Sequence, residues 1–436
     1  MMPAGPTNRS DGVQRHRLVH AVSRRRGRLG VLRHIGPGLI TGAADDDPSG
    51  IGTYSQLGAQ FRFAMLWTVP VSLPLAAAVE ELAARLGLAG GEGLASLIKK
   101  TFPSPVMYVA AVLVAVANTF NIGADLGSMV ASLQLVIPIP FVPLLITITA
   151  VLIVLEVFVQ YHQYARLLRF LTLSLFAYIA VLAVVHVDWA AVARNLAIPH
   201  ISASKDYLAG LVAIFGTTIS PYLMFWQCSE EVEERADRPR PVRRVTPAQI
   251  FGMRIDVIVG MATAVAIMFS ILVVSASTLG AHGITNIGSA DQAAQALRPL
   301  AGNLAGLLFA VGIVGTGALA VPVLAGSTGY ALAEVFAWNE GLAKSFHQAR
   351  GFYIVIIGSM FVGLLMNVVG LNPIRALLYA AFLNGLTAPP LIFLMLLLGN
   401  NKRAVHRYRS GWLSNSLVGL ACLLMTALPL AYVIVK

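Results

Sequence analysis

Three consecutive aspartates, Asp45, Asp46 and Asp47, lie inside an apolar stretch and directly precede Pro48. An ionised carboxylate is costly in an apolar environment and neighbouring negative charges repel one another, so such residues are retained where a cation or a cavity compensates them. Oxygen atoms of carboxylates, hydroxyls, carbonyls and water are the ligands of hard divalent cations. Asp47 is therefore predicted to be the principal ligand of a divalent metal ion. Asp45 and Asp46 are weaker candidates because adjacent residues do not face one point, and the alternative for all three is a helix cap or a cavity mouth.

A second polar group interrupts the apolar sequence IFGTTISPYLMFW, near residue 220. The carbonyl of Thr217 and the hydroxyls of Ser220 and Tyr222 are candidate oxygen donors there. No histidine or methionine occupies the interruption itself. Because imidazole and thioether ligands would select late transition metals, an oxygen-rich site favours Mg²⁺ or Mn²⁺. The alternative for Thr217 and Ser220 is that they only repair backbone hydrogen bonds around the interruption.

A polar stripe is predicted on one helix, since Asn118, Asn121 and Asp125 recur at spacings of three and four residues. Such a stripe in an apolar segment usually faces a cavity or a partner helix. Asp125, with Asn121 beside it, is predicted to serve an ion or proton pathway, or else to be buried in structural hydrogen bonds. Asn384 and Tyr379 are weaker candidates of the same kind. The remaining acidic residues of this type are attributed to packing or interfaces: Glu80, Glu81, Glu156, Asp256 and Glu334.

The elements that carry these residues are predicted from composition. The chain has 436 residues, of which 57% are hydrophobic and only 12% charged, and its mean hydropathy is +0.75. An average soluble domain is about a quarter charged, so a soluble protein is excluded. Apolar segments of about 20 residues are long enough to cross the ~30 Å hydrocarbon core of a bilayer. We therefore predict an all-α integral membrane protein with about eleven spans, near residues 35–60, 63–88, 104–134, 141–161, 167–187, 207–229, 250–279, 300–336, 351–370, 373–399 and 411–435.

The net charge of +11 is attributed to membrane topology rather than to nucleic-acid binding. Basic residues concentrate in alternate loops, beginning with the arginines at 24–26 before the first apolar segment. By the positive-inside rule, this distribution predicts a cytoplasmic N-terminus and an outside C-terminus in the cell (inner) membrane. The chain is thus expected to comprise a basic cytoplasmic tail, residues 1–34, and one transmembrane domain, residues 35–436, in contact with membrane lipid.

Two of the predicted spans should be broken. Pro48 removes a backbone donor and disfavours the helical conformation at Asp47, and Pro221 does the same beside Ser220. Two interrupted spans, the first and the sixth, separated by four intact ones are typical of an inverted repeat of five plus five helices. In such a repeat the substrate binds where both helices unwind, and the eleventh span would be an addition. The end of the first half-helix would also present the negative pole of its dipole to a cation near Asp47.

The block GPGLITGAADDDPSGIGTYSQLGAQF, residues 36–61, resembles the first helix of the NRAMP family of divalent-metal transporters, whose hallmark is D-P-G-N. The block EELAARLGLAGGEGLA, residues 80–95, is similar to the family's second helix and the loop that follows. The resemblance implies the LeuT-type fold with unwound helices 1 and 6, and transport by alternating access in the domain 35–436. Carried over by position, it places the metal-binding aspartate on Asp47 and the carbonyl donor on Thr217.

The chain departs from the family pattern at four positions. Gly50 stands where the family has asparagine, Ser220 replaces the methionine of the A-x-x-M-P-H motif, and Tyr222 replaces that motif's histidine. A second family histidine falls on Gln227. Loss of the thioether removes a ligand that discriminates against alkaline-earth ions, and loss of both histidines argues against proton coupling. These changes are similar to the divergent NRAMP-related branch that includes magnesium transporters, in which Gly50 and Ser220 would leave room for a partly hydrated ion.

The expected function is uptake of Mg²⁺ and/or Mn²⁺ into the cytoplasm by alternating access, without proton coupling. One alternative is a proton-coupled Mn²⁺/Fe²⁺ symporter in which Asp125 replaces the missing histidines. Another is a LeuT-type carrier of an organic solute, which the aspartate triplet fits poorly. No nucleophile-base pair, zinc-protease motif or phosphate loop is found, so an enzyme is not expected. The divalent cation is the substrate, and no cofactor, nucleic acid or obligatory protein partner is expected.

Overall fold

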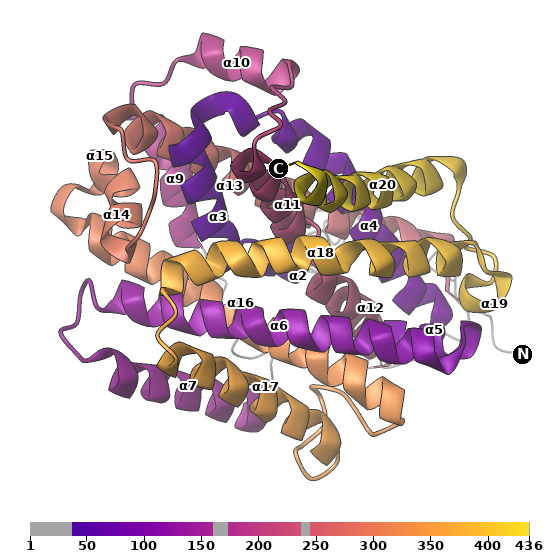
Figure 1. The fold of residues 1–436 in the computed structure, drawn as a ribbon. Helices are drawn as coiled ribbons and strands as arrows, with labels where there is room; N and C mark the ends of the chain where they lie inside the picture. The colour runs from indigo at the N-terminus through magenta and orange to yellow at the C-terminus, as the bar shows by residue number, and fades with distance from the viewer. Residues whose placement is uncertain (1–36, 160–172, 237–244, 436) are drawn as a thin grey trace, which may run out of the picture. The chain divides into compact units, whose positions relative to one another are not determined.

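The computed structural model describes residues 37–159, 173–236 and 245–435, and all regular secondary structure in these ranges is helical. Figure 1 shows the succession of long helices in these ranges. The predicted basic tail, residues 1–34, lies outside the described residues, so the division into tail and domain stays a prediction.

Eight helical segments of the described chain are long and apolar enough to span a membrane. They match eight of the eleven predicted spans and confirm an all-α membrane protein. They are α6 (Ser104–Leu133), α7 (Phe141–Phe158), α11 with α12 (Lys205–Thr218 and Pro221–Ala236), α13 (Pro247–Thr278), α16 (Ala305–Phe336), α17 (Arg350–Val368), α18 (Pro373–Asn400) and α20 (Trp412–Ile434).

The other three predicted spans have individual explanations. The first is divided into α2 (Pro37–Asp45) and α3 (Pro48–Phe61), each too short to span alone. The second is α4 (Thr68–Gly90), which meets the criteria only together with α3, and the two segments are bent by 114°. The predicted span 167–187 begins outside the described residues, and its described part contains α9 (Phe176–Leu182).

Both predicted breaks are present. α2 ends at Asp45 and α3 begins at Pro48, while α11 ends at Thr218 and α12 begins at Pro221. Each proline opens the second half-helix, where its missing N–H costs no hydrogen bond and its fixed φ suits a first turn. The short interruption between each pair leaves carbonyl groups without helical partners, at a depth where lipid offers none.

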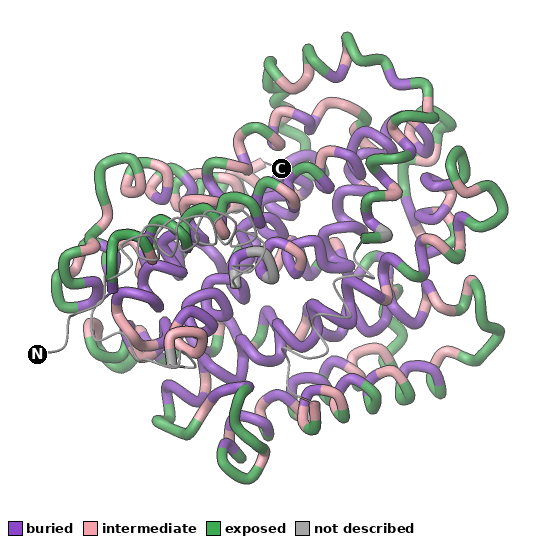
Figure 2. Tube along the Cα trace, turned by 180° about the vertical axis from the view of Figure 1, so that it is seen from behind, coloured by how far each residue is buried: buried purple, intermediate pink, exposed green. Residues whose placement is uncertain are grey.

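The interior and the rim of the described domain differ in burial. Most residues of the half-helices α3 and α11 are buried. In α7 and α20, by contrast, only 28% and 17% of the most apolar 18-residue stretch is buried. Figure 2 shows the same pattern, with buried chain inside and exposed chain around it. Large apolar side chains are exposed on the rim, among them Val112, Phe158 and Leu423. Exposed apolar residues in such number belong against lipid.

Close helix packing holds the second break in place. A Cβ atom added to Gly216 of α11 would lie 2.2 Å from the carbonyl oxygen of Ala381 in α18, and one added to Gly385 would lie 2.4 Å from the carbonyl oxygen of Val212. Only glycine permits this approach, because it lacks a Cβ atom. The α11 backbone therefore lies directly on α18, which fixes the position of Thr217.

The remaining described helices are short connections at the ends of the spans. They are α5 (Leu94–Thr101), α10 (Trp189–Ala197), α14 (Ala290–Ala294), α15 (Arg298–Ala301) and α19 (Lys402–Val405).

Candidate metal-binding site

Asp47 lies at the centre of the first break and caps α3. Its Oδ1 atom accepts hydrogen bonds from the backbone N–H of Gly50 and the hydroxyl of Ser49, both at 2.7 Å. Its Oδ2 atom accepts longer ones from Asn121 at 3.2 Å and Tyr222 at 3.4 Å. The capping interpretation is therefore correct for Oδ1. The longer contacts leave Oδ2 as the oxygen best placed to bind a cation, so capping and metal ligation are compatible.

The second break faces the first through hydroxyl groups. Thr217 Oγ1 lies 3.5 Å from the Ser49 hydroxyl, and it would lie 3.2 Å from a Cβ atom on Gly50. A side chain at position 50 would thus press on Thr217, so glycine permits the close approach of the two breaks here. Tyr222 also donates a hydrogen bond of 2.8 Å to the carbonyl oxygen of Ala44, at the end of α2. These contacts bring Asp47, Gly50, Thr217 and Tyr222 together.

Ser220 has a local role in the second break. Its hydroxyl is directed at the carbonyl oxygens of Thr217, at 2.7 Å, and Gly216, at 3.1 Å. This is the predicted repair of backbone hydrogen bonds. The oxygen lone pairs of Ser220 stay available, but the Thr217 carbonyl, which is a candidate ligand itself, already accepts one hydrogen bond.

The three residues of the predicted polar stripe on α6 have different surroundings. Asn118 donates to the carbonyl oxygen of Leu324 and to the hydroxyl of Thr328, and so joins α6 to α16. Asn121 contacts Asp47 directly. Asp125 is fully buried beside the backbone of Ser49, and neither of its carboxylate oxygens has a hydrogen-bond partner among the described residues.

The other candidates lie around this centre. Gln227 accepts a hydrogen bond from Thr41 and donates one of 3.2 Å to Glu231, so it links α12 to α2 rather than to Asp47. Asn384 of α18 is fully buried, and its amide atoms have no partner in the described part of the chain. Asp46 is 2% exposed and its Oδ2 atom lacks a partner there too. Tyr379 is 55% exposed and lies away from the breaks.

The donor set at the breaks consists of oxygen atoms. Within residues 37–159, 173–236 and 245–435, no three His, Cys, Asp or Glu side chains are grouped to hold a metal ion. One carboxylate supplemented by hydroxyls, carbonyls and water suits a hard cation that keeps part of its hydration shell. The arrangement does not suit a structural metal enclosed by several charged ligands.

Two residues near the breaks, Tyr54 and Met268, escaped the sequence analysis, and a third, Glu80, was attributed there to packing or an interface. Tyr54 lies 3.0 Å from the Thr218 hydroxyl and joins α3 to α11, and its spacing of seven from Asp47 placed it on the same helix face. Met268 of α13 brings a thioether within 3.9 Å of that same Thr218 hydroxyl, rather than to Asp47, and no local signal in the sequence indicated it. Glu80 is 1% exposed, and neither of its carboxylate oxygens has a hydrogen-bond partner among the described residues.

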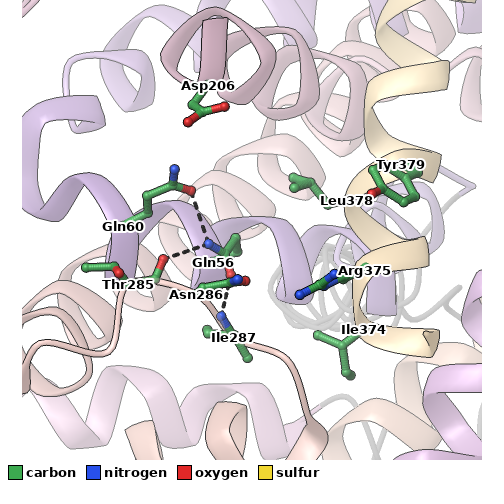
Figure 3. A pocket seen from close by; sticks show the side chains of 10 residues that line it. All are labelled: Gln56, Gln60, Asp206, Thr285, Asn286, Ile287, Ile374, Arg375, Leu378 and Tyr379. Carbon is green, nitrogen blue, oxygen red and sulfur yellow. Dashed lines mark hydrogen bonds between the residues drawn. The ribbon is translucent and has the colours of Figure 1, made fainter. Parts of the chain in front are cut away.

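A separate cavity of about 380 Å³ opens beyond the first break, between α3, α11, α18 and the loop that follows α13. Figure 3 shows its polar lining, where Gln56 bonds to Gln60 and to the backbone of Thr285 and Ile287. Asp206 and Arg375 supply the charges of the lining. Its other lining residues are Asn286, Ile374, Leu378 and Tyr379.

A contact between α3 and α18 separates this cavity from Asp47. A Cβ atom on Gly52, one turn before Gln56, would lie 2.6 Å from Cδ1 of Leu377. Asp47 and Tyr222 are 0% exposed and Ser220 is 1% exposed. The residues of the break are therefore buried, and between them and the cavity Gly52 of α3 lies in close contact with Leu377 of α18.

The fold and the site together define a class: a multi-pass membrane protein whose two broken helices meet at a buried carboxylate and neutral oxygen donors. The family model described as natural resistance-associated macrophage protein-like matches residues 38–435. The chain belongs to this family, Nramp.

Curated relatives agree with this assignment. The divalent metal cation transporter MntH of Clostridium acetobutylicum is 30% identical over 400 residues, which are 88% of this chain and 86% of that protein. The MntH of Deinococcus radiodurans is 27% identical over 329 residues, 72% of this chain and 73% of that protein.

Solved structures confirm the predicted fold. The manganese transporter of Eremococcus coleocola superposes with a TM-score of 0.73 at 17% identity, covering 98% of this chain and 88% of its own. Mhp1, a nucleobase-cation-symport-1 transporter, superposes with a TM-score of 0.56 at 12% identity, covering 91% and 90%. The LeuT-type arrangement predicted from the two breaks is therefore correct.

Proposed function

We propose that this chain carries divalent metal cations, Mg²⁺ and/or Mn²⁺, into the cytoplasm by alternating access, with no obligatory proton coupling. One observation carries the proposal: the Asp47 carboxylate lies where two broken helices meet, and every neighbouring donor is an oxygen or an amide. The names of the MntH relatives support a divalent cation as the substrate.

The choice of a hard ion rests on the chemistry of the donors. Gly50 permits the close approach of Thr217, and Ser220 brings a hydroxyl where the family has a thioether. Mg²⁺ gives up its water reluctantly, so one carboxylate with neutral oxygen donors favours it, whereas a sulfur ligand would favour softer ions. Asp47 would bind the ion directly, while Thr217, Ser220 and Tyr222 would contact it or its water.

The membrane potential supplies a driving force without protons. A negative interior favours entry of each elementary charge by ~2.3 kcal/mol per 100 mV, and a divalent ion gains this twice. The proposed orientation, with the N-terminus in the cytoplasm and the C-terminus outside, rests on the distribution of basic residues in the loops. It places the Figure 3 cavity on the outside face, as the entry for the ion.

A proton-coupled Mn²⁺ or Fe²⁺ carrier is the second candidate, and one observation favours it. Asp125 is buried beside the first break, and its carboxylate oxygens have no hydrogen-bond partner within the described part of the chain. Such a group inside a membrane is typical of a proton relay, and it would replace the histidines that Tyr222 and Gln227 displace.

The test is uptake into proteoliposomes held at a set interior-negative potential, with Mg²⁺, Mn²⁺ and Ca²⁺ offered separately while internal pH is recorded. Uptake of Mg²⁺ with no acidification is the expected result. Uptake of Mn²⁺ alone, accompanied by acidification, would replace the proposal with the proton-coupled carrier. No uptake of any of the three ions at any potential would reject divalent-cation transport.

A further inference from the structure

The first half-helix of the broken span, α2, lies directly on the backbone of α13. A Cβ atom added to Gly42 would lie 2.4 Å from the carbonyl oxygen of Gly260, and one added to Gly38 would lie 2.7 Å from the backbone nitrogen of Val257. Gly38 and Gly42 are four residues apart, so they share one face of α2. Small residues at this spacing let two helices in a membrane approach closely. The glycine face therefore determines which side of α2 meets α13.

Asp256 of α13 adds a hydrogen bond at the same interface. The backbone N–H of Gly38 donates to its Oδ2 atom at 2.7 Å. The first N–H groups of a helix have no partner within the helix, and they form the positive end of its dipole. The first turn of α2 holds no acidic residue of its own. A carboxylate from a neighbouring helix thus takes this place, whereas the sequence alone indicated only packing or an interface for Asp256.

The other end of α2 reaches the ion site. The carbonyl oxygen of Ala44 accepts the 2.8 Å hydrogen bond from Tyr222 of α12, and Asp47 follows three residues after Ala44. α2 has nine residues, which make a helix about 13 Å long at 1.5 Å per residue. A regular helix of this length moves as one piece, so a shift at its start would also displace the carbonyl of Ala44.

We propose that Asp256 is a positioning residue for the transported cation. It fixes the start of α2 on α13 and thereby the place of the Ala44 carbonyl and of Asp47 at the break. The two neighbours of α2 differ in kind, since backbone meets backbone at α13, whereas side chains make the hydrogen bonds to α12. α13 is therefore the support on which α2 is placed. This inference rests on the proposed function, because it concerns the site of the same ion.

The experiment compares Asp256→Ala, Asp256→Asn and Arg254→Gln with the unaltered protein in proteoliposomes. Initial uptake rates of Mn²⁺ and Mg²⁺ over a range of concentrations at fixed potential give the apparent KM and the maximal rate, and the Tm in detergent is recorded for each variant. Asparagine keeps an oxygen that can accept the N–H of Gly38. Arg254→Gln is the matched control, because it removes a charge two residues away on α13 and a 2.8 Å hydrogen bond to Glu81 of α4. Glu81 keeps Arg85, one turn along α4, as a partner.

Asp256→Ala should raise the apparent KM for both ions about fivefold and change the maximal rate less than about twofold, because a displaced α2 weakens binding of the ion. Asp256→Asn should restore most of the affinity. Arg254→Gln should lower Tm while the apparent KM stays within about twofold. In Tyr222→Phe, where the hydrogen bond to Ala44 is already absent, Asp256→Ala should raise the apparent KM less than about twofold further, since both residues act on the same helix.

Gly42→Ala tests the same placement of α2 without altering Asp256. Its Cβ atom would meet the backbone of Gly260, so the apparent KM should rise at least as much as in Asp256→Ala. Gly252→Ala is the control on α13, because a Cβ atom there meets no other atom within 4 Å. Its apparent KM should equal that of the unaltered protein. If one of the two test variants cannot be reconstituted, the other decides.

An unchanged apparent KM in Asp256→Ala or in Gly42→Ala would overturn the inference while leaving the proposed function in place. A fall in Tm alone would assign Asp256 to stability. Effects of Asp256→Ala and Tyr222→Phe that multiply in the double variant would also overturn the inference, because the two residues would then act independently. Failure of the unaltered protein to take up either ion would instead reject the proposed function.

Discussion

The two helix breaks meet at one point but compensate for their lost backbone hydrogen bonds differently. At the first, Asp47 caps α3 with one carboxylate oxygen, while Asp45 and Asp46 each retain an oxygen without a partner in the described structure. At the second, the Ser220 hydroxyl bonds to the carbonyls of Gly216 and Thr217, and the Thr218 hydroxyl bonds to the carbonyl of Ile214.

This difference in hydrogen bonding indicates that the two breaks have different roles. The second break replaces part of its lost backbone hydrogen bonds with its own hydroxyls. The first break carries buried carboxylate oxygens of Asp45 and Asp46 with no partner in the described chain, and in the proposed function the cation would compensate them. Changes at the first break should therefore affect transport most, and changes at the second should affect selectivity or stability.

The largest effect is expected at Asp47. Asp47→Ala should reduce uptake of Mg²⁺ and Mn²⁺ to the level of empty liposomes, about 100-fold or more, because one buried carboxylate supplies the binding charge. Asp47→Asn is the informative control, since asparagine caps a helix as well as aspartate does and keeps α3 intact. Proteoliposome uptake and Tm are the measurements. Retained transport in Asp47→Asn would show that the carboxylate acts only as a cap.

The next effect concerns selectivity at the second break. Ser220→Met restores a thioether and should move the preference from Mg²⁺ toward Mn²⁺ by about tenfold, measured as the ratio of their competitive uptake rates. Ser220→Leu has a similar size without sulfur and should lose uptake of both ions without that shift. Equal shifts in the two variants would mean that volume, and not ligand chemistry, sets the preference.

A smaller effect is expected where the breaks are joined. Tyr222→Phe removes the hydrogen bond to Ala44 and the weak contact to Asp47. The loss of one hydrogen bond is worth ~1 kcal/mol, so uptake should fall about fivefold while selectivity stays the same. Uptake by Tyr222→Phe is measured in parallel with uptake by Asp47→Asn. A loss as complete as that of Asp47→Asn would make the tyrosine hydroxyl an essential ligand.

The smallest effect on transport is expected for Ser220→Ala. Alanine removes the hydroxyl that bonds to Gly216 and Thr217, so Tm should fall, at a cost of about 1 kcal/mol, while uptake should change less than about threefold. The measurement is a thermal unfolding curve beside an uptake assay. A large loss of uptake with unchanged Tm would reverse the comparison and place a direct ligand in the second break.

Much of this architecture could be predicted from local chemistry. The breaks follow from Pro48 and Pro221, and the meeting of Asp47 with Thr217 and Tyr222 follows from the repeat that those breaks imply. The membrane spans follow from length and apolarity alone. The breaks and the spans depend on nearest neighbours in sequence, which a single chain records, and the long-range meeting follows from the fold that the breaks imply.

What escaped prediction depends on contacts between distant segments. Glu80 and Glu81 look alike in sequence, and only the packing of α4 on α13 shows that Arg254 reaches one of them. The spacing of four from Glu81 to Arg85 was a signal that could have separated the two. Asn118 contacts α16 and Asn121 contacts Asp47. Which partner each of them reaches likewise depends on where α16 and the first break lie.

The glycine contact between α11 and α18 bears on how the site could open. Where two helix backbones touch with no side chain between them, sliding would require both to be rebuilt, so α11 and α18 are expected to move as one rigid body. The α3 side differs, because there Gly52 lies against a side chain, Leu377, whose Cδ1 atom makes the closest contact and whose Cβ atom is next. A rotamer change of one leucine is rapid compared with a helix displacement. We therefore expect the contact between Gly52 and Leu377 to open more readily than the backbone contact between α11 and α18.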